Sequence, residues 1–201
     1  EQRAWRETCI LFNQSFHMTD MYVEGPDAPR LLEHLGVNTF KNFGPNKAKQ
    51  SVPVNYDGYV IGDVVLFHLE QNRFNLVGRP PVHNWVQYHA ETGKYDVTLD
   101  RDERTVARTG PNALTRKAYR FQVQGPNALK VMEKGSGKAV PDVKFFNMTE
   151  FTIAGKRVRA LRHGMVGQPG FELFGPWDDG EAVKAALVES GQEFGIKLSG
   201  S

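Results

Sequence analysis

Two stretches of this sequence, one hundred positions apart, repeat the same pattern. Residues 23–35 read VEGPDAPRLLEHL and residues 123–135 read VQGPNALKVMEKG, so both carry the frame V-x-G-P-(D/N)-A before an apolar pair and a glutamate. Gly-Pro is typical of a turn, and the apolar spacing that follows predicts an amphipathic helix. Two β-turn-α units are too few and too distant for a solenoid. The repeat therefore indicates a duplicated α+β architecture.

The segments around the two units read mostly as strands. β-branched and aromatic residues gather at 58–69 and 72–80, which form a predicted hairpin, and 82–91 predicts a helix. Strand and helix do not alternate regularly, which favours an α+β fold with mostly antiparallel sheets and flanking helices. Further strands are expected at 95–100, 118–125, 145–153, 156–164 and 171–176, and a helix at 178–195 with Asp178 or Asp179 as its N-cap.

Composition limits the classes of function. The 201 residues are 40% hydrophobic and 24% charged, as in ordinary globular proteins. The net charge of +2 and the lack of a Lys/Arg run give no support for nucleic-acid binding. No apolar run approaches the roughly 18 residues of a membrane span, so a membrane is not an expected partner. The single cysteine, Cys9, excludes an intrachain disulfide and favours a cytoplasmic setting.

Residues 162–176, RHGMVGQPGFELFGP, place a carboxylate in an unusual setting. The density of glycine and proline predicts a tight irregular turn, followed by a short strand at 171–174. In that strand Phe171 and Leu173 share one face and Glu172 points to the other. Most strand glutamates are exposed, but glycine beside a strand also marks the close approach of a ligand or another backbone. Both interpretations of Glu172 stay open on this evidence.

Three further side chains could carry chemistry. Asp63 interrupts the apolar pattern of 58–69, so it is expected to be paired, protonated or exposed at the strand end. Arg79 ends a strand before two prolines, where its planar fork could bind a carboxylate or phosphate or could simply be solvated. His17 could transfer a proton near neutral pH or be structural.

Several catalytic classes are disfavoured by missing motifs. The six histidines show no HxH or HxxxH spacing and Cys9 has no partner cysteine, so no metal site is expected. The sequence also has no GxSxG, P-loop or GxGxxG motif. A metalloenzyme, a triad hydrolase and a dinucleotide enzyme are therefore not favoured.

Three stretches, in order, resemble the motifs of one family. Residues 10–35 resemble its segment F-D-x-S-x-M-x-x-x-x-(V/L)-x-G-x-D-A. Residues 124–128, QGPNA, resemble its L-Q-G-P-x-A, and residues 162–176 resemble its R-x-G-Y-T-G-E-x-G-(Y/V)-E-(I/L). The whole chain is thus similar to the folate-binding part of the aminomethyltransferase (glycine-cleavage T-protein) superfamily, which implies tetrahydrofolate as cofactor.

The resemblance also implies a domain organisation. Residues 1–50 together with 115–201 would form the folate-binding domain, and 51–114 a second α+β domain. The polar stretch 103–117 is the expected boundary region. The chain begins without Met and ends soon after a helix, so we expect a fragment whose third, barrel-like domain lies beyond Ser201.

One branch of the family is the closer match. Residues 46–54, 76–90 and 144–155 resemble the tetrahydrofolate-dependent aryl O-demethylases that act on lignin-derived vanillate and syringate. The implied reaction transfers a methyl group from an aryl methyl ether to N5 of tetrahydrofolate, giving a phenol and 5-methyltetrahydrofolate. A small aryl methyl ether and folate are thus the expected ligands, and the sequence does not indicate an oligomeric state.

The resemblance assigns roles to individual residues. Glu172 matches the glutamate that holds the pterin, because a carboxylate can accept from a ring N–H and an exocyclic amino group at once. His17 is the candidate for orienting or protonating the phenolic oxygens. The resemblance also implies cofactor contacts from Met18, Asp63 and Met165, and substrate contacts from Gln14, His17 and Arg79.

Two positions of this chain differ from the motifs of the aminomethyltransferases that act in glycine cleavage. Aminomethyltransferases carry two consecutive aspartates of which the first is catalytic, whereas this chain has Gly62-Asp63. The family tyrosine of G-Y-T-G is Met165 here. An aminomethyltransferase or another folate-dependent one-carbon transferase remains the alternative. A second alternative is a non-catalytic folate-binding protein, although this sequence lacks the K-G-C-Y-x-G-Q motif that such proteins carry.

Overall fold

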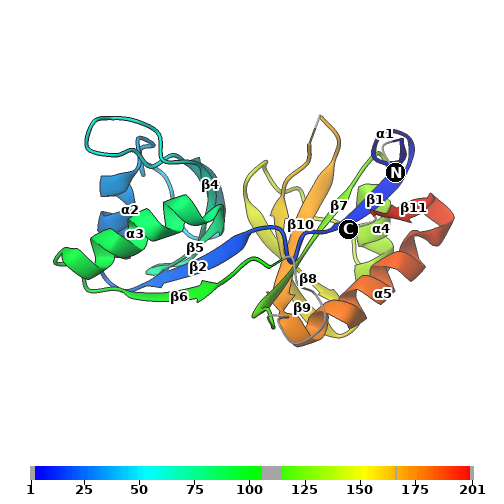
Figure 1. Ribbon diagram of the computed structural model, residues 1–201. Coiled ribbons are helices and arrows are strands. Elements are labelled where there is room, and N and C mark those ends of the chain that lie inside the picture. The colour runs from blue at the N-terminus through cyan, green and yellow to red at the C-terminus, as the bar shows by residue number, and fades with distance from the viewer. Residues whose placement is uncertain (1–2, 106–114, 166, 200–201) are drawn as a thin grey trace. The chain divides into compact units, whose positions relative to one another are not determined.

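The protein forms two compact units, each built on a sheet with helices on one face (Figure 1). The computed structural model describes residues 3–105, 115–165 and 167–199. Unit 1 is Glu1–Phe16 with Thr115–Ser201, and unit 2 is His17–Leu114. The expected α+β class with mostly antiparallel sheets is confirmed. In the described ranges, no helix has the length and apolar character needed to cross a membrane.

Unit 1 contains a six-stranded sheet in the order β11-β1-β7-β10-β9-β8. The β1–β11 pair is parallel, and the other neighbouring pairs are antiparallel. The strands are β1 Cys9–Asn13, β7 Ala118–Gln124, β8 Met148–Ile153, β9 Lys156–Arg162, β10 Gly170–Pro176 and β11 Ile196–Leu198. The helices are α1 Ala4–Glu7, α4 Ala128–Ser136 and α5 Gly180–Gly191, with short 3₁₀ turns η1 Trp177–Asp179 and η2 Gln192–Phe194.

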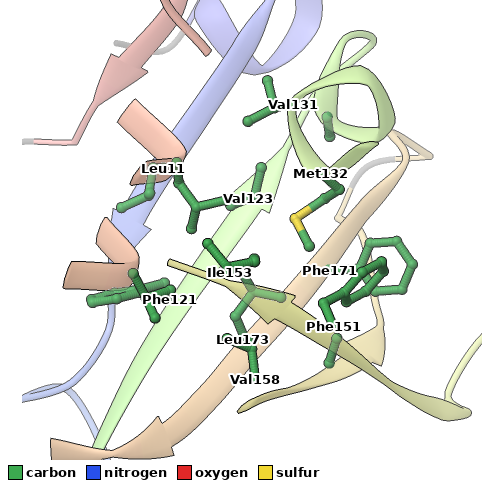
Figure 2. Close-up of a cluster of buried hydrophobic side chains, with 14 of the residues drawn as sticks. Leu11, Phe121, Val123, Val131, Met132, Phe151, Ile153, Val158, Phe171 and Leu173 are labelled. Carbon is green, nitrogen blue, oxygen red and sulfur yellow. The ribbon is translucent and has the colours of Figure 1, made fainter. Parts of the chain in front are cut away.

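The hydrophobic core of unit 1 lies between its sheet and the helices α4 and α5, which contact each other. Phe171 and Leu173 of β10 both point into this core, so the predicted two-faced pattern of that strand is confirmed. Full burial of each such side chain stabilises the fold by about 1.5–3 kcal/mol. Figure 2 labels ten of the core residues: Leu11, Phe121, Val123, Val131, Met132, Phe151, Ile153, Val158, Phe171 and Leu173.

Unit 2 contains a five-stranded antiparallel sheet in the order β3-β4-β5-β2-β6. Its core packs α2 and α3 against one face of the sheet, with Leu31 and Val82 among the fully buried contacts. The strands are β2 Thr19–Glu24, β3 Lys47–Ser51, β4 Val64–Glu70, β5 Arg73–Gly78 and β6 Thr98–Asp102. The helices are α2 Ala28–Leu35 and α3 Pro80–Thr92.

The sequence repeat corresponds to the same turn geometry in both units. β2 leads into α2 through Gly25 with φ 143°, and β7 leads into α4 through Gly125 with φ 132°. A Cβ on Gly25 would lie 2.3 Å from the carbonyl oxygen of Asp96, and one on Gly125 would lie 2.6 Å from that of Thr8. Both turns therefore need glycine for its backbone freedom and for the close approach of another chain segment.

The division between the units differs from the one expected at residue 50. Residues 17–50 pack in unit 2, because β2 lies inside its sheet, between β5 and β6. A strand with partners on both sides cannot be separated from that sheet without losing two ladders of hydrogen bonds. Most of the expected boundary region at 103–117 lies outside the described residues.

The strand expected at 58–69 begins only at Val64. The Asn55 side chain accepts hydrogen bonds from the backbone N–H groups of Asp57 and Tyr59, which folds the preceding residues into a turn. An asparagine side chain that binds the backbone two residues on is a common turn former. The apolar pattern alone did not reveal that the Asn55 side chain favours a turn over a strand here.

The helix expected at 178–195 is divided into η1, α5 and η2. Asp179 occupies the N-cap position of α5, but its side chain makes no capping hydrogen bond. Its Oδ1 lies 2.8 Å from Nζ of Lys156 in β9. The carboxylate therefore ties the sheet to the start of the helix instead of capping it.

The glycine turns predict a specific stability difference. Gly125→Ala should lower the free energy of unfolding by about 1–3 kcal/mol from backbone strain, with the clash against Thr8 adding to this cost. Gly137, with φ 66° in the left-handed region and no atom within 4 Å of a Cβ, provides a control with milder strain and no clash. Urea unfolding should show a larger loss for Gly125→Ala than for Gly137→Ala. Equal losses would show that neither the more unusual φ of Gly125 nor the close approach to Thr8 carries an extra cost.

Candidate functional site

The sheet of unit 1 has a second face that is polar but buried. Alternation along β7 sends Phe121 and Val123 into the core. Arg120, Gln122 and Gln124 point to the other side, yet they are at most 4% exposed. Three long polar side chains in a row are costly to bury unless their groups are paired. We call these three residues and Glu172 the polar row.

Strand register places the members of the polar row beside one another. In the β7–β10 ladder, Gln122 lies opposite Glu172 and Gln124 lies opposite Gly170. Arg120 lies opposite Phe174, and its guanidinium carbon sits 5.0 Å from the centroid of that ring. Directly opposite residues have Cβ atoms about 4.5–5.5 Å apart. The four side chains thus form one continuous patch.

Glu172 is the charged centre of this patch. It is 6% exposed, with Oε1 lying 2.5 Å from Nη1 of Arg120 and Oε2 lying 3.5 Å from Nδ1 of His163. Burial acts to raise the pKa of Glu172, but the positive charge of Arg120 and the contact with His163 outweigh it and lower the pKa below its ordinary value. The carboxylate is therefore ionised at neutral pH in spite of its burial.

The glycine-rich loop between β9 and β10 is fastened to the polar row. Gln124 donates through Nε2 to the carbonyl of Met165, 3.3 Å away, and accepts at Oε1 from the Met165 N–H, 2.9 Å away. Gln122 donates through Nε2 to the carbonyl of His163 at 2.9 Å. A Cβ on Gly170 would lie 2.9 Å from that carbonyl and 3.1 Å from Nε2 of Gln122. Glycine at position 170 leaves room for this hydrogen bond.

A pocket of about 800 Å³ opens on the β1 side of the same face. Phe12, which lines it, pairs in register with Gln122, so Glu172 lies two strands away, at about 10 Å. A pocket of this size can hold a drug-sized molecule. Its walls combine apolar, aromatic and basic side chains: Arg3, Trp5, Arg6, Glu7, Ile10, Phe12, Gln14 and Met165.

Unit 2 gathers a second set of predicted residues at one end of its sheet. Gly78 pairs with Thr19 on one side and with Val64 on the other. The neighbouring residues Met18, Asp63 and Arg79 consequently lie at the same end of β2, β4 and β5. Asp63 and Arg79 are exposed there, and Met18 is half-buried.

Asp63 is paired and exposed at the strand end, as two of the expected alternatives had it, but it lies outside the strand. It precedes β4 instead of interrupting it, and its Oδ2 accepts a hydrogen bond of 2.7 Å from Nε2 of Gln50. It is therefore a paired carboxylate at the strand end. His17 is the exposed first residue of unit 2, and Arg79 occupies the N-cap position of α3.

The predicted site residues thus fall into two groups. Gln14 and Met165 line the pocket over the face of unit 1 that carries Glu172, whereas His17, Met18, Asp63 and Arg79 belong to unit 2. The other members of the polar row and His163 were not predicted from the sequence. The signal for it was present, because AYRFQVQ alternates apolar residues with Arg120, Gln122 and Gln124. In the described ranges, no three His, Cys, Asp or Glu side chains are arranged to hold a metal ion.

Comparison with known proteins identifies one family for this chain. The family described as "GCVT N-terminal domain" matches residues 1–201. The chain is 59% identical over 200 residues to the syringate O-demethylase of Sphingobium sp. (strain SYK-6), covering all of this chain and 43% of that protein. It is 30% identical over 208 residues to an aminomethyltransferase of Corynebacterium aurimucosum, of which it covers 52%. The chain thus spans about half the length of the curated relatives it matches.

Solved structures agree at the level of the fold. The crystal structure of the glycine cleavage system aminomethyltransferase T from Bartonella henselae superposes with a TM-score of 0.74 at 21% identity, over 98% of this chain and 49% of that one. The heterotetrameric sarcosine oxidase from Corynebacterium sp. U-96, in complex with pyrrole 2-carboxylate, superposes with a TM-score of 0.63 at 14% identity, over 97% of this chain and 89% of that one. Similarity at this level of identity shows a shared fold alone.

The buried ion pair predicts how stability depends on pH. Arg120→Met should lower the free energy of unfolding at pH 7 by about 3–5 kcal/mol, because it leaves the Glu172 carboxylate buried without its main partner. In the native protein the pair contributes above the ordinary pKa of glutamate, and this contribution is lost as pH falls through the lowered folded pKa. The pKa of Glu172 should rise in the variant, so acid should favour its folded state.

Chemical unfolding at several pH values between 7 and 3.5 measures this difference. The difference in the free energy of unfolding between the native protein and Arg120→Met should become smaller as the solution becomes acidic. Arg157→Met, which breaks the exposed pair with Glu150 in the same sheet, should cost less than about 1 kcal/mol. A gap that stays constant across this range would show that the ionisation of Glu172 is not coupled to Arg120.

Proposed function

This chain belongs to the GCVT N-terminal domain family, and from that premise we propose that its protein is a tetrahydrofolate-dependent O-demethylase of aryl methyl ethers. Its substrate class would be methoxylated benzoates such as syringate and vanillate. Tetrahydrofolate would supply N5 as the methyl acceptor, and a phenol would be the other product. The 59% identity to a syringate O-demethylase over the whole chain supports this activity more than the 30% identity to an aminomethyltransferase does.

One observation carries the folate part of the proposal. An ionised carboxylate, Glu172, is buried on the sheet face over which a pocket large enough for a folate-sized molecule opens, about 10 Å from Phe12 of that pocket. A pterin presents a ring N–H next to an amino group, and an ionised carboxylate can accept from both. A carboxylate has about four acceptor positions, of which Arg120 and His163 engage two. Glu172 would thus keep the capacity to hold the pterin while staying paired to Arg120.

Other residues of unit 1 fit the same ligand. Met165 lines the pocket, and two aromatic side chains, Trp5 and Phe12, offer flat apolar surface for a ring. The ring centroids of Trp5 and Phe12 lie 6.3 Å apart in an edge-to-face arrangement. Within unit 2, Met18 and Asp63 would contribute further cofactor contacts.

Substrate recognition is assigned to the end of the unit 2 sheet and to Gln14. Arg79 is exposed, always charged, and fixed at its backbone by the following prolines, so it suits a ring carboxylate. Nδ1 of the buried His83 lies 2.9 Å from the Arg79 carbonyl oxygen and Nε2 lies 3.0 Å from that of Leu76, so the imidazole packs between these two carbonyls. His17 would orient or protonate the phenolic oxygens as the ether bond breaks.

The aminomethyltransferase alternative requires an acid where this chain has Gly62. A Cβ built on Gly62 would lie 3.0 Å from Cγ2 of Val82, which is tighter than ordinary contact. The Val82 side chain of α3 therefore crowds the position where the alternative needs a catalytic aspartate. This crowding counts against aminomethyl transfer.

The proposed function predicts the behaviour of Glu172→Gln in the full-length protein. Loss of the charged acceptor should weaken tetrahydrofolate binding by about 1.5–3 kcal/mol, measured by titration calorimetry. Glu150→Gln, which changes a surface glutamate of the same sheet, is the matched control and should bind as the native protein does. Native protein should also convert syringate with tetrahydrofolate to the demethylated phenol.

Two results would contradict this assignment. An unchanged affinity for tetrahydrofolate in a folded Glu172→Gln variant would show that Glu172 does not anchor the pterin. Release of ammonia from an aminomethyl-carrier protein, with no demethylation of syringate, would move the protein to the aminomethyltransferase class.

The substrate assignment predicts a selective effect of Arg79→Lys. An arginine fork binds a carboxylate through two hydrogen bonds that lysine cannot reproduce. The variant should raise KM for syringate and hardly change the turnover of 2,6-dimethoxyphenol, which has no carboxylate. Arg73→Lys, at the opposite end of β5, should alter neither. Equal losses for both substrates, with folate affinity intact, would exclude a carboxylate clamp.

A further inference from the structure

His83 brings a polar side chain into the apolar core of unit 2. It lies in the first turn of α3 and is fully buried, and its helix neighbours Val82 and Val86 both belong to that core. Burying a polar side chain is costly unless it is paired, whereas an apolar side chain would fill the same place without needing partners. A histidine at this position therefore indicates that its hydrogen bonds matter, and not only its volume.

Both ring nitrogens of His83 face backbone carbonyls. Nδ1 lies 2.9 Å from the carbonyl oxygen of Arg79, which occupies the N-cap position of α3, and Nε2 lies 3.0 Å from that of Leu76 in β5. A carbonyl oxygen can only accept, so each ring nitrogen that carries a hydrogen donates it to the backbone. The imidazole thus spans the turn by which β5 leads into α3.

The direction of the Arg79 side chain depends on this turn. Within the described part of unit 2, the exposed guanidinium has no hydrogen bond or ion pair, and the side chain does not cap α3. The two prolines that follow fix their own φ angles but have no N–H with which to hold a neighbouring carbonyl. The peptide group of Arg79, whose oxygen faces His83, therefore determines where the guanidinium points.

We propose that His83 is a positioning residue, whose Nδ1–H binds the Arg79 carbonyl and thereby aims the guanidinium at the ring carboxylate of the substrate. This inference rests on the proposed function, which assigns that carboxylate to Arg79. An arginine fork binds both oxygens of a carboxylate only when its two hydrogen bonds are aligned, so its direction matters as well as its charge. Loss of the His83 contact should therefore affect only substrates that carry the carboxylate.

A second histidine of unit 2 provides a matched control. His68 in β4 is 7% exposed, and its ring nitrogens lie 3.1 Å from the carbonyl oxygen of Phe43 and 3.3 Å from that of Gln71. His68 pairs in register with Phe74, near the start of β5, whereas Arg79 follows the end of that strand. Replacing His68 thus removes a similarly buried and bonded imidazole at a place remote from Arg79.

Steady-state kinetics of the full-length protein with syringate and with 2,6-dimethoxyphenol test the proposal. His83→Leu removes both contacts and should raise KM for syringate about three- to tenfold, with kcat and the kinetics of 2,6-dimethoxyphenol unchanged. His68→Leu should alter the kinetics of neither substrate. Thermal melts of the ligand-free proteins show whether each variant has kept its fold.

Two polar replacements separate the contacts of the ring. The amide nitrogen of asparagine takes the place of Nδ1, and that of glutamine takes the place of Nε2. His83→Asn should therefore keep KM for syringate within about twofold of the native value, whereas His83→Gln should raise it as His83→Leu does. This comparison also decides the matter if His83→Leu does not fold.

Three results would count against the inference. Equal KM values for syringate in the asparagine and glutamine variants, or equal losses on both substrates, would overturn it and leave His83 as a packing residue. A native-like KM for syringate in folded His83→Leu would do the same. Failure of the proposed function is distinguishable, because then the native protein would not demethylate syringate, or Arg79→Lys would leave KM for syringate unchanged.

Discussion

The buried pair of Arg120 and Glu172 is the interaction on which the rest of this site depends. Removing a carboxylate from water costs several kcal/mol, and only a close positive charge with good geometry offsets that cost. Arg120 provides it from the adjacent strand, with Nη1 at 2.5 Å. Because β7 supplies the arginine and β10 the glutamate, the charge is held by the sheet itself and not by a mobile loop. A rigid, ionised acceptor in a dry setting is what recognition of neighbouring N–H groups requires.

β7 serves two purposes because its side chains alternate. One face supplies Phe121 and Val123 to the core in Figure 2, and the opposite face supplies the polar row. The core gives this strand a fixed register between β1 and β10. A slip of one residue would bury Arg120 in the apolar core and expose Phe121. The packing that stabilises unit 1 therefore also determines which polar groups meet.

Much of this fold could be predicted from the sequence, and the exceptions have physical causes. The two Gly-Pro turns and the two-faced strand around Glu172 could be predicted because local patterns determine them. Arg120 could not be found as the partner of Glu172, because 52 positions separate them and only the register of β7 on β10 joins them. The start of β4 was misplaced because the Asn55 side chain binds the backbone and folds the residues before Val64 into a turn, so the strand begins later than the apolar pattern indicates. A motif can identify a site residue such as Glu172, but its charge partner follows only from the pairing of the strands.

A crystal structure of the full-length protein bound to tetrahydrofolate tests the central claim most directly. The account predicts that the ring N–H and the 2-amino group of the pterin lie within hydrogen-bond distance of the Glu172 carboxylate, with Arg120 still paired behind it. A pterin bound elsewhere, with Glu172 in contact only with Arg120 and His163, would contradict the account and leave the ion pair as a purely structural feature of unit 1.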